Sequence, residues 1–252
     1  MERFDKPEDI CAHLGDDYDR YHGAIVPPPF QNTLFTRKTK NHGYTYTRTK
    51  NPTIEIAEQK IAALEGGEAA LCFSSGMAAI SAAVMHCLGK DDHVVCVKSV
   101  YPGARELLNA YLRKIGVTVS FVPGDDVEQF AQAIRPNTRL IYLESPSSLV
   151  FRLQDLAAVA ALAKAHGIAT VIDNTWATPL FQNPLKFGID IVVHSASKYL
   201  GGHSDILGGV IVSNADTIEQ IARKERLMFG AVMDPHQAWL LIRSLRTLPV
   251  RM

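Results

Sequence analysis

The chain has 252 residues, of which 47% are hydrophobic and 21% charged, a composition ordinary for one large or two small globular domains. Its 26 basic residues balance its 26 acidic ones, so the charge gives no support to nucleic-acid or anionic-membrane binding. No apolar run has membrane-spanning length, and the polar N-terminus lacks a signal-peptide core. The four cysteines form no CxxC pair and no secreted disulfide framework, which indicates a reduced, cytoplasmic protein.

The first part of the chain, residues 1–55, has few periodic apolar runs. Three consecutive prolines at 27–29 favour extended backbone over helix, and the segment 42–53 is polar, aromatic and rich in turn residues. This pattern predicts an N-terminal extended arm that packs against something larger. A mobile tail is the alternative, which the many aromatic residues disfavour.

A regular pattern begins at residue 51, and residues 56–252 are expected to form the large domain. A helix is predicted to begin near Pro52, capped by Asn51 or Thr53, and to end at the glycines 66–67. Short apolar runs then alternate with helical patterns, which predicts an α/β fold: a mostly parallel seven-stranded sheet with helices on both faces. The expected strands cover residues 69–73, 93–97, 117–122, 139–144, 168–173, 191–195 and 209–213.

The last segment of the sequence, 216–252, is predicted to form two helices. Apolar residues within 238–245 are expected to be exposed there and to favour association with a partner.

Polar residues follow the predicted strands, where α/β sheets bind their ligands. Asp173 ends one strand, and Ser195, Ser197 and Lys198 follow the next. Ser74, Ser75 and Gly76 open a helix after strand 69–73, and Tyr101 follows strand 93–97. We expect these side chains to converge on one crevice.

The helix that starts near Gly76 offers free backbone N–H groups for an anion, although a serine there is equally consistent with a plain cap. The sequence has neither GxGxxG nor GxxxxGK[ST], which disfavours a dinucleotide or P-loop nucleotide site. A metal site is poorly supported: His194 is predicted to be packed and His203 to be a polar turn residue.

Lys198 and Asp173 suit pyridoxal phosphate (PLP). A lysine amine of lowered pKa can form a Schiff base with its aldehyde, and an acid can keep its pyridine nitrogen protonated. Taken singly, Asp173 is also consistent with a cap in its turn, and Lys198 with a surface lysine. The joint set with Ser195, Ser197 and Gly76 favours the cofactor.

Four segments carry a specific resemblance. Residues 44–53 (YTYTRTKNPT), 70–80 (ALCFSSGMAAI), 171–195 and 195–210 (SASKYLGGHSDILGGV) closely resemble the Cys/Met-metabolism family of PLP enzymes. This family contains cystathionine γ-synthase, cystathionine γ- and β-lyases and methionine γ-lyase. The likeness runs from about residue 23 to 252 and implies the aspartate aminotransferase-like, fold type I large domain.

The resemblance implies a role for each matching residue. Lys198 would carry PLP and move protons, Asp173 would bind the ring nitrogen, and Tyr101 would stack on the ring. The phosphate cradle would comprise Ser75, Gly76, Met77, Ser195 and Ser197.

The resemblance also implies a homo-oligomer, a dimer or a dimer of dimers (homotetramer). Tyr46 and Arg48 would reach the phosphate of a neighbouring subunit. A guanidinium suits phosphate because it can donate two parallel hydrogen bonds.

The sequence departs from the family pattern at three places. Ser148 stands where an asparagine usually contacts the ring hydroxyl, so that contact is expected to be lost or water-bridged, and Pro102 replaces a small residue after Tyr101. The small C-terminal domain is expected to be absent, and turnover to be weak without it.

The predicted function is a carbon–sulfur lyase that acts by β- or γ-elimination on cystathionine or a related thioether amino acid. The alternatives are γ-replacement on an acyl-homoserine, a truncated non-catalytic PLP-binding interaction subunit and, at the level of fold, another PLP enzyme such as an aminotransferase.

Overall fold

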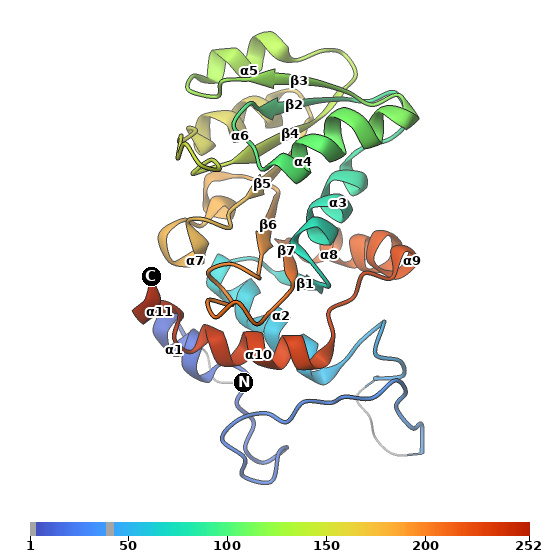
Figure 1. Cartoon of the computed structure of the whole chain (residues 1–252), viewed down its shortest axis with the longest axis vertical. Coiled ribbons are helices and arrows are strands. Elements are labelled where there is room, and N and C mark those ends of the chain that lie inside the picture. Colours follow the sequence, from blue (N-terminus) through green and yellow to red (C-terminus); the bar gives the residue numbers. More distant parts are fainter. Residues whose placement is uncertain (1–3, 39–42) are drawn as a thin grey trace.

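Seven strands form one sheet in the order β1-β7-β6-β5-β4-β2-β3 (Figure 1). The structure is a computed structural model that describes residues 4–38 and 43–252. The sheet is parallel except at β7, which runs antiparallel to both of its neighbours. The predicted fold class is thereby confirmed. The strands are β1 Ala69–Phe73, β2 His93–Val97, β3 Thr118–Val122, β4 Thr138–Glu144, β5 Ala169–Asp173, β6 Ile191–Ser195 and β7 Gly209–Ser213.

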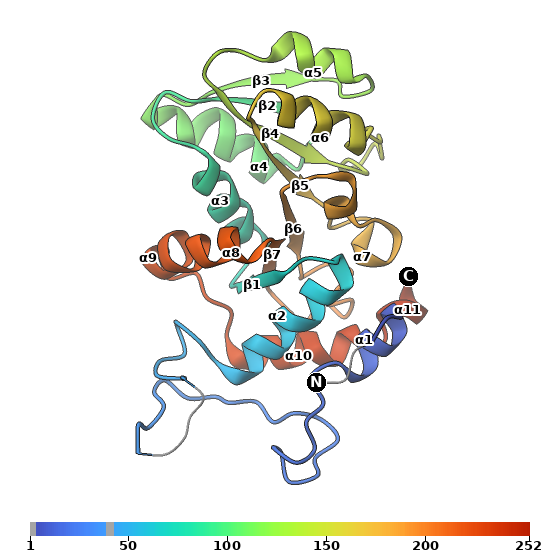
Figure 2. The ribbon, with the colours of Figure 1, turned by 180° about the vertical axis from the view of Figure 1, so that it is seen from behind.

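Helices cover both faces of the sheet. α3 packs on β5, β6 and β7 and shares its face with α4, whereas α6 and α7 lie on the opposite face, as the two views show (Figures 1 and 2). Because both faces are covered, the central strands are continuous apolar runs rather than alternating ones. The helices of the described residues are α1 Pro7–His13, α2 Pro52–Glu65, α3 Gly76–Cys87, α4 Pro102–Glu106, α5 Val127–Ala133, α6 Leu156–Ala165, α7 Thr178–Phe181, α8 Ala215–Ile221, α9 Leu227–Phe229, α10 Pro235–Leu245 and α11 Leu248–Arg251.

The ends of α2 follow the predicted chemistry. The Asn51 side chain accepts a hydrogen bond from the backbone N–H of Thr53, and Pro52 occupies the first helical position. Gly66 ends the helix in the left-handed conformation, at φ 72°. This geometry fixes the C-terminal end of α2, which carries Glu65, against the sheet.

The expectation that the apolar residues within 238–245 are exposed is wrong. Leu241, Ile242 and Leu245 of α10 are fully buried. Their burial arises because α10 lies across α2, as both views show (Figures 1 and 2). Helical periodicity alone showed an apolar face, but not which distant helix covers it.

Within its described residues, the expected arm contains α1 and the first residues of α2. α1 packs against α2 and α11. The buried Lys60 of α2 donates hydrogen bonds of 3.0 and 3.1 Å to the carbonyls of Ile10 and Cys11. Desolvation by burial lowers the pKa of Lys60 to about 8. α2 begins at Pro52, within the expected arm range of 1–55.

Among the described residues, no helix combines the length and apolar character needed to cross a membrane. The cysteines Cys11, Cys72, Cys87 and Cys96 are all free thiols.

Candidate functional site

The carboxyl ends of β4, β5 and β6 bring three polar residues to one edge of the sheet. The strand register pairs Glu144 with Asp173 and Asp173 with Val193. Ser195 lies two residues beyond Val193, so it shares the face of Asp173. The N-terminus of α3 meets Ser195 on this same face, so Gly76 and Ser195 lie together and Asp173 shares their face of the sheet.

The start of α3 has the form of an anion cradle. A Cβ on Gly76 would lie 2.8 Å from the Ser195 Oγ, so only glycine allows this close approach. Ser75 accepts a 3.1 Å hydrogen bond from the Ala78 N–H and thus caps the helix, which agrees with the alternative of a plain cap. The N–H groups of Gly76 and Met77 belong to the first turn, which has no intrahelical acceptor for them. The Ser75 cap and an anion bound by the N–H groups of Gly76 and Met77 are therefore compatible in the same turn.

Asp173 is a buried carboxyl, 6% exposed, at the end of β5. Its Oδ1 accepts a 3.0 Å hydrogen bond from the Thr175 N–H, so it also stabilises the turn. Burial raises the pKa of Asp173, while the Thr175 hydrogen bonds and the nearby His194 oppose this effect. The Thr175 Oγ1 in turn accepts a 2.8 Å bond from the Ser195 N–H, which ties β5 to β6.

Tyr101 lies at the N-terminus of α4 and is 44% exposed. Its backbone N–H donates a 2.6 Å hydrogen bond to the Glu144 Oε2. A Cβ on Gly103 would lie 2.5 Å from the Tyr101 ring and 2.8 Å from the Met77 sulfur. Glycine at 103 therefore lets the ring and Met77 pack together. Pro102 takes the first position of α4, where its missing N–H is harmless.

Lys198 lies in an exposed turn directly after β6. Its backbone N–H donates to the Ser195 carbonyl at 3.1 Å, and its own carbonyl accepts from Gly202 at 2.7 Å. Within residues 4–38 and 43–252, the amine has no hydrogen-bond partner. Ser197 is held nearby, since its Oγ accepts a 3.0 Å bond from the Gly208 N–H. The turn thus presents an accessible amine beside Ser195.

Within the described chain, no hydrogen bond, ion pair or ring contact joins Tyr46 or Arg48 to this edge of the sheet. Arg48 donates a 3.0 Å hydrogen bond to the Leu227 carbonyl, and its guanidinium lies 5.2 Å from the centre of the Tyr46 ring. Both residues line a cavity of about 400 Å³ together with Asn32 and Met233.

A second polar cluster lies on the opposite face of the sheet, behind Asp173. His194 Nε2 lies 2.5 Å from the Glu65 Oε1, and both side chains are fully buried. Asn174 donates a 2.7 Å bond to the same Glu65 oxygen, and Gln182 donates a 2.8 Å bond to the Asn174 side chain. His194 and Asn174 each neighbour a site residue in sequence. The cluster therefore fixes the ends of β5 and β6 from behind, and His194 is packed, as predicted.

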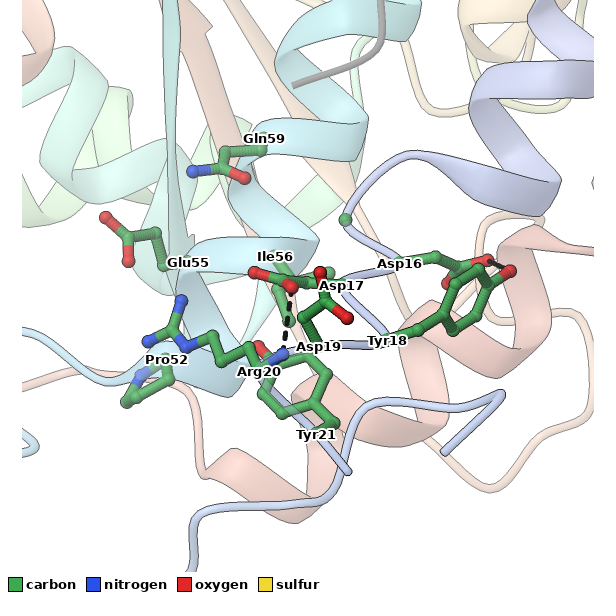
Figure 3. A pocket seen from close by; sticks show the side chains of 11 residues that line it. Asp16, Asp17, Tyr18, Asp19, Arg20, Tyr21, Pro52, Glu55, Ile56 and Gln59 are labelled. Carbon is green, nitrogen blue, oxygen red and sulfur yellow. Dashed lines mark hydrogen bonds between the residues drawn. The ribbon is translucent and has the colours of Figure 1, made fainter. Parts of the chain in front are cut away.

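A cavity of about 470 Å³ lies elsewhere, between residues 15–21 and the start of α2 (Figure 3). Its lining includes the carboxylates of Asp16, Asp17, Asp19 and Glu55. These carboxylates repel a phosphate, so this cavity does not suit an anionic cofactor.

Comparison with known proteins gives one consistent answer. The sequence profile of the Cys/Met metabolism PLP-dependent enzymes matches residues 8–252. The chain belongs to this family.

Two relatives and one solved structure illustrate the match. The chain is 41% identical to a cystathionine γ-lyase of Bacillus subtilis over 98% of this chain and 65% of the relative. It is 39% identical to a protein of Herpetosiphon aurantiacus named "Probable cystathionine gamma-synthase", over 96% of this chain and 76% of the relative. The crystal structure of cystathionine γ-lyase from Lactobacillus plantarum complexed with L-serine superposes with a TM-score of 0.92 at 39% identity, covering 98% of this chain and 65% of that chain. This chain thus spans about two thirds of the length of these two lyases.

The family is PLP-dependent, and the residues of this chain fit that cofactor. The Gly76 cradle leaves no room for a Cβ, the α3 amides suit a phosphate, and the buried Asp173 suits a protonated ring nitrogen.

Sequence reasoning missed three residues of the site, Glu144, Thr175 and Gly103. Glu144 ends the run 139–144, so the rule that singled out Asp173 could have found it. Thr175 and Gly103 act through backbone contacts, which spacing in the sequence does not reveal.

Proposed function

We propose that this chain binds PLP at the ends of β5 and β6. Lys198 provides the amine for covalent attachment and later moves the substrate α-proton, while Asp173 holds the proton on the ring nitrogen. PLP supplies an electron sink for the charge that develops at the substrate α-carbon. Tyr101 stacks on the ring. The phosphate is bound by Ser75, Gly76, Met77, Ser195 and Ser197.

We further propose that the protein is a carbon–sulfur lyase for cystathionine or a related thioether amino acid. The names of the Bacillus subtilis and Lactobacillus plantarum relatives support lyase chemistry. The name of the Herpetosiphon aurantiacus relative favours γ-replacement on an acyl-homoserine as the second candidate. The observation that carries the proposed cofactor site is a chain of hydrogen bonds at one edge of the sheet. These bonds connect Asp173, Thr175, Ser195 and Lys198.

Product analysis distinguishes the two reactions. The PLP-loaded protein is incubated with cystathionine, with methionine, or with an acyl-homoserine and a thiol. A lyase releases a keto acid from the thioethers, whereas a synthase forms a new thioether only in the third mixture. Absence of product in all three mixtures with a protein of the relatives' full length would show that the proposed substrate class is wrong.

The protein is proposed to act as a homo-oligomer, with residues 1–55 as the arm and 56–252 as the cofactor-binding domain. Tyr46 and Arg48 would serve a neighbouring subunit, which agrees with their lack of contact with their own strand ends and with the cavity that they line. The free thiols support a cytoplasmic location.

Replacing Arg48 by alanine is expected to weaken PLP binding about tenfold or more, because a bidentate, charge-assisted contact with the phosphate is lost. Equilibrium dialysis measures the affinity. Arg152→Ala is the matched control, since Arg152 is an exposed arginine whose one ion pair among the described residues is with Asp125. If Arg48→Ala retained PLP as tightly as the parent, the shared site would be refuted.

A further inference from the structure

A buried carboxyl stands at the end of β4, beside the proposed cofactor site. Glu144 is 6% exposed, and the strand register places it next to Asp173. Its Oε2 accepts the 2.6 Å hydrogen bond from the Tyr101 N–H, and its Oε1 accepts a hydrogen bond from the Ser148 hydroxyl. None of the steps proposed above uses this carboxyl.

The bond to Glu144 fixes the start of α4 relative to the sheet. Tyr101 precedes the helix in an extended conformation, and its carbonyl accepts a 3.1 Å bond from the Arg105 N–H. Its half-exposed ring packs at Gly103 close to Met77. A shift of the Tyr101 backbone would therefore move the ring away from the start of α3.

The same carboxyl determines what Ser148 can do. A serine hydroxyl can donate a single hydrogen bond, and the Ser148 hydroxyl donates its own to Glu144. An asparagine at this position would present two N–H donors. The expected water-bridged contact between Ser148 and the cofactor would require this proton or a lone pair of the same oxygen.

We propose that Glu144 is a positioning residue. It accepts a hydrogen bond from the Tyr101 backbone N–H and so holds Tyr101 in place for the cofactor ring. It also accepts the hydrogen bond of the Ser148 hydroxyl, which is then not donated to the cofactor. The effect of Glu144 on the cofactor rests on the proposed PLP site, but the hydrogen bond from the Tyr101 N–H to Glu144 can be tested without PLP.

The charge state of Glu144 gives the arrangement a pH dependence. Burial and the neighbouring Asp173 raise the pKa of Glu144 to about 7, while the hydrogen bonds from Ser148 and Tyr101 oppose this rise. Among the described residues, Tyr142 of β4 and Cys96 of β2 also interact electrostatically with Glu144, and burial raises the pKa of both, so both stay neutral. Protonation of Glu144 below pH 7 thus replaces a charged acceptor with a weaker neutral one.

The first experiment measures hydrogen exchange at the Tyr101 amide without PLP. Glu144→Ala is expected to speed this exchange about tenfold or more, and Glu144→Gln to restore most of the protection. In the parent the protection factor should fall as the pH drops through 7, whereas Glu144→Gln should show no such step. If Glu144→Ala does not fold, the inference is tested by the pH dependence of the protection factor in the parent and in Glu144→Gln. Equal protection in all variants, or a pH step that persists in Glu144→Gln, would overturn the inference.

The second experiment compares PLP affinities of single variants. Glu144→Ala is expected to weaken PLP binding about tenfold, whereas Ser148→Ala should change it by less than about threefold, because Glu144 already takes the hydrogen bond of the Ser148 hydroxyl. Ser147→Ala is the control, because the Ser147 hydroxyl bonds the Arg152 N–H on the same loop but not Glu144. A tenfold loss on Ser148→Ala with Glu144 present would mean that the Ser148 hydroxyl acts on the cofactor directly, and the inference would be wrong.

The two proposals fail differently. If the parent does not bind PLP while the Tyr101 amide behaves as expected, the proposed function is wrong and the positioning bond stands. If the parent binds PLP at Lys198 but every Glu144 variant binds it equally well, the positioning role is wrong and the cofactor site stands.

Discussion

The variant Asp173→Asn is expected to lose PLP affinity by about tenfold or more without losing stability. The neutral amide cannot hold a proton on the ring nitrogen by charge, and hydrogen bonds to charged groups contribute more than neutral ones. The asparagine oxygen can still accept the Thr175 N–H, so the turn is retained. Equilibrium dialysis with PLP and urea unfolding of the same preparation measure the two quantities.

The stability expectation follows from the direction of the pKa shift. Burial raises the pKa of Asp173 above its unfolded value, so the stability associated with its neutral form is lost as the pH rises through the folded pKa. At neutral pH the asparagine variant is therefore expected to be at least as stable as the parent. A variant that unfolds more easily but binds PLP as tightly as the parent would show that Asp173 serves only the turn.

The variant Glu65→Ala is expected to lower the free energy of unfolding by about 3–5 kcal/mol, because removal of one partner leaves a buried polar group uncompensated. Glu65 and His194 are both fully buried, and Asn174 also depends on the Glu65 carboxyl. Glu65→Gln keeps an acceptor and is expected to lose about 1–3 kcal/mol. Urea denaturation measures these changes.

The matched control for Glu65 is a pair at the surface. Asp125 forms a 2.7 Å ion pair with Arg152, and about half of each side chain is exposed. Asp125→Ala should therefore change the free energy of unfolding by about 1 kcal/mol or less. If Glu65→Ala proved as mild as this control, the cluster behind the site would not fix the ends of β5 and β6.

Much of the sheet could be predicted because its strands are uninterrupted apolar runs bounded by turn residues. β1, β2, β6 and β7 have the predicted bounds, and β3 starts one residue later than expected. The helical region after Tyr101 shows what apolar periodicity leaves open. It divides into α4, a π-helical segment at Leu107–Tyr111 and a 3-10 segment at Leu112–Ile115. Apolar periodicity does not distinguish these hydrogen-bond patterns over so few residues.

The site was predictable where a residue's position at a strand end indicates its role. Gly76 lies against Ser195, and Asp173 lies on the same face of the sheet. The Ser148 hydroxyl could not be assigned from sequence, because its acceptor, Glu144, belongs to a neighbouring structural element and is recognised only by contact. The burial of α10 escaped prediction for the same reason: its partner α2 lies far away in the sequence.

The most direct test of the cofactor site is borohydride reduction of the PLP-incubated protein, followed by peptide mass spectrometry. We expect one phosphopyridoxyl adduct, on Lys198, and no adduct in the corresponding peptide of Lys198→Ala. No adduct in the parent, or adducts distributed over surface lysines and unchanged in Lys198→Ala, would contradict the assignment of Lys198 and of the site built around it.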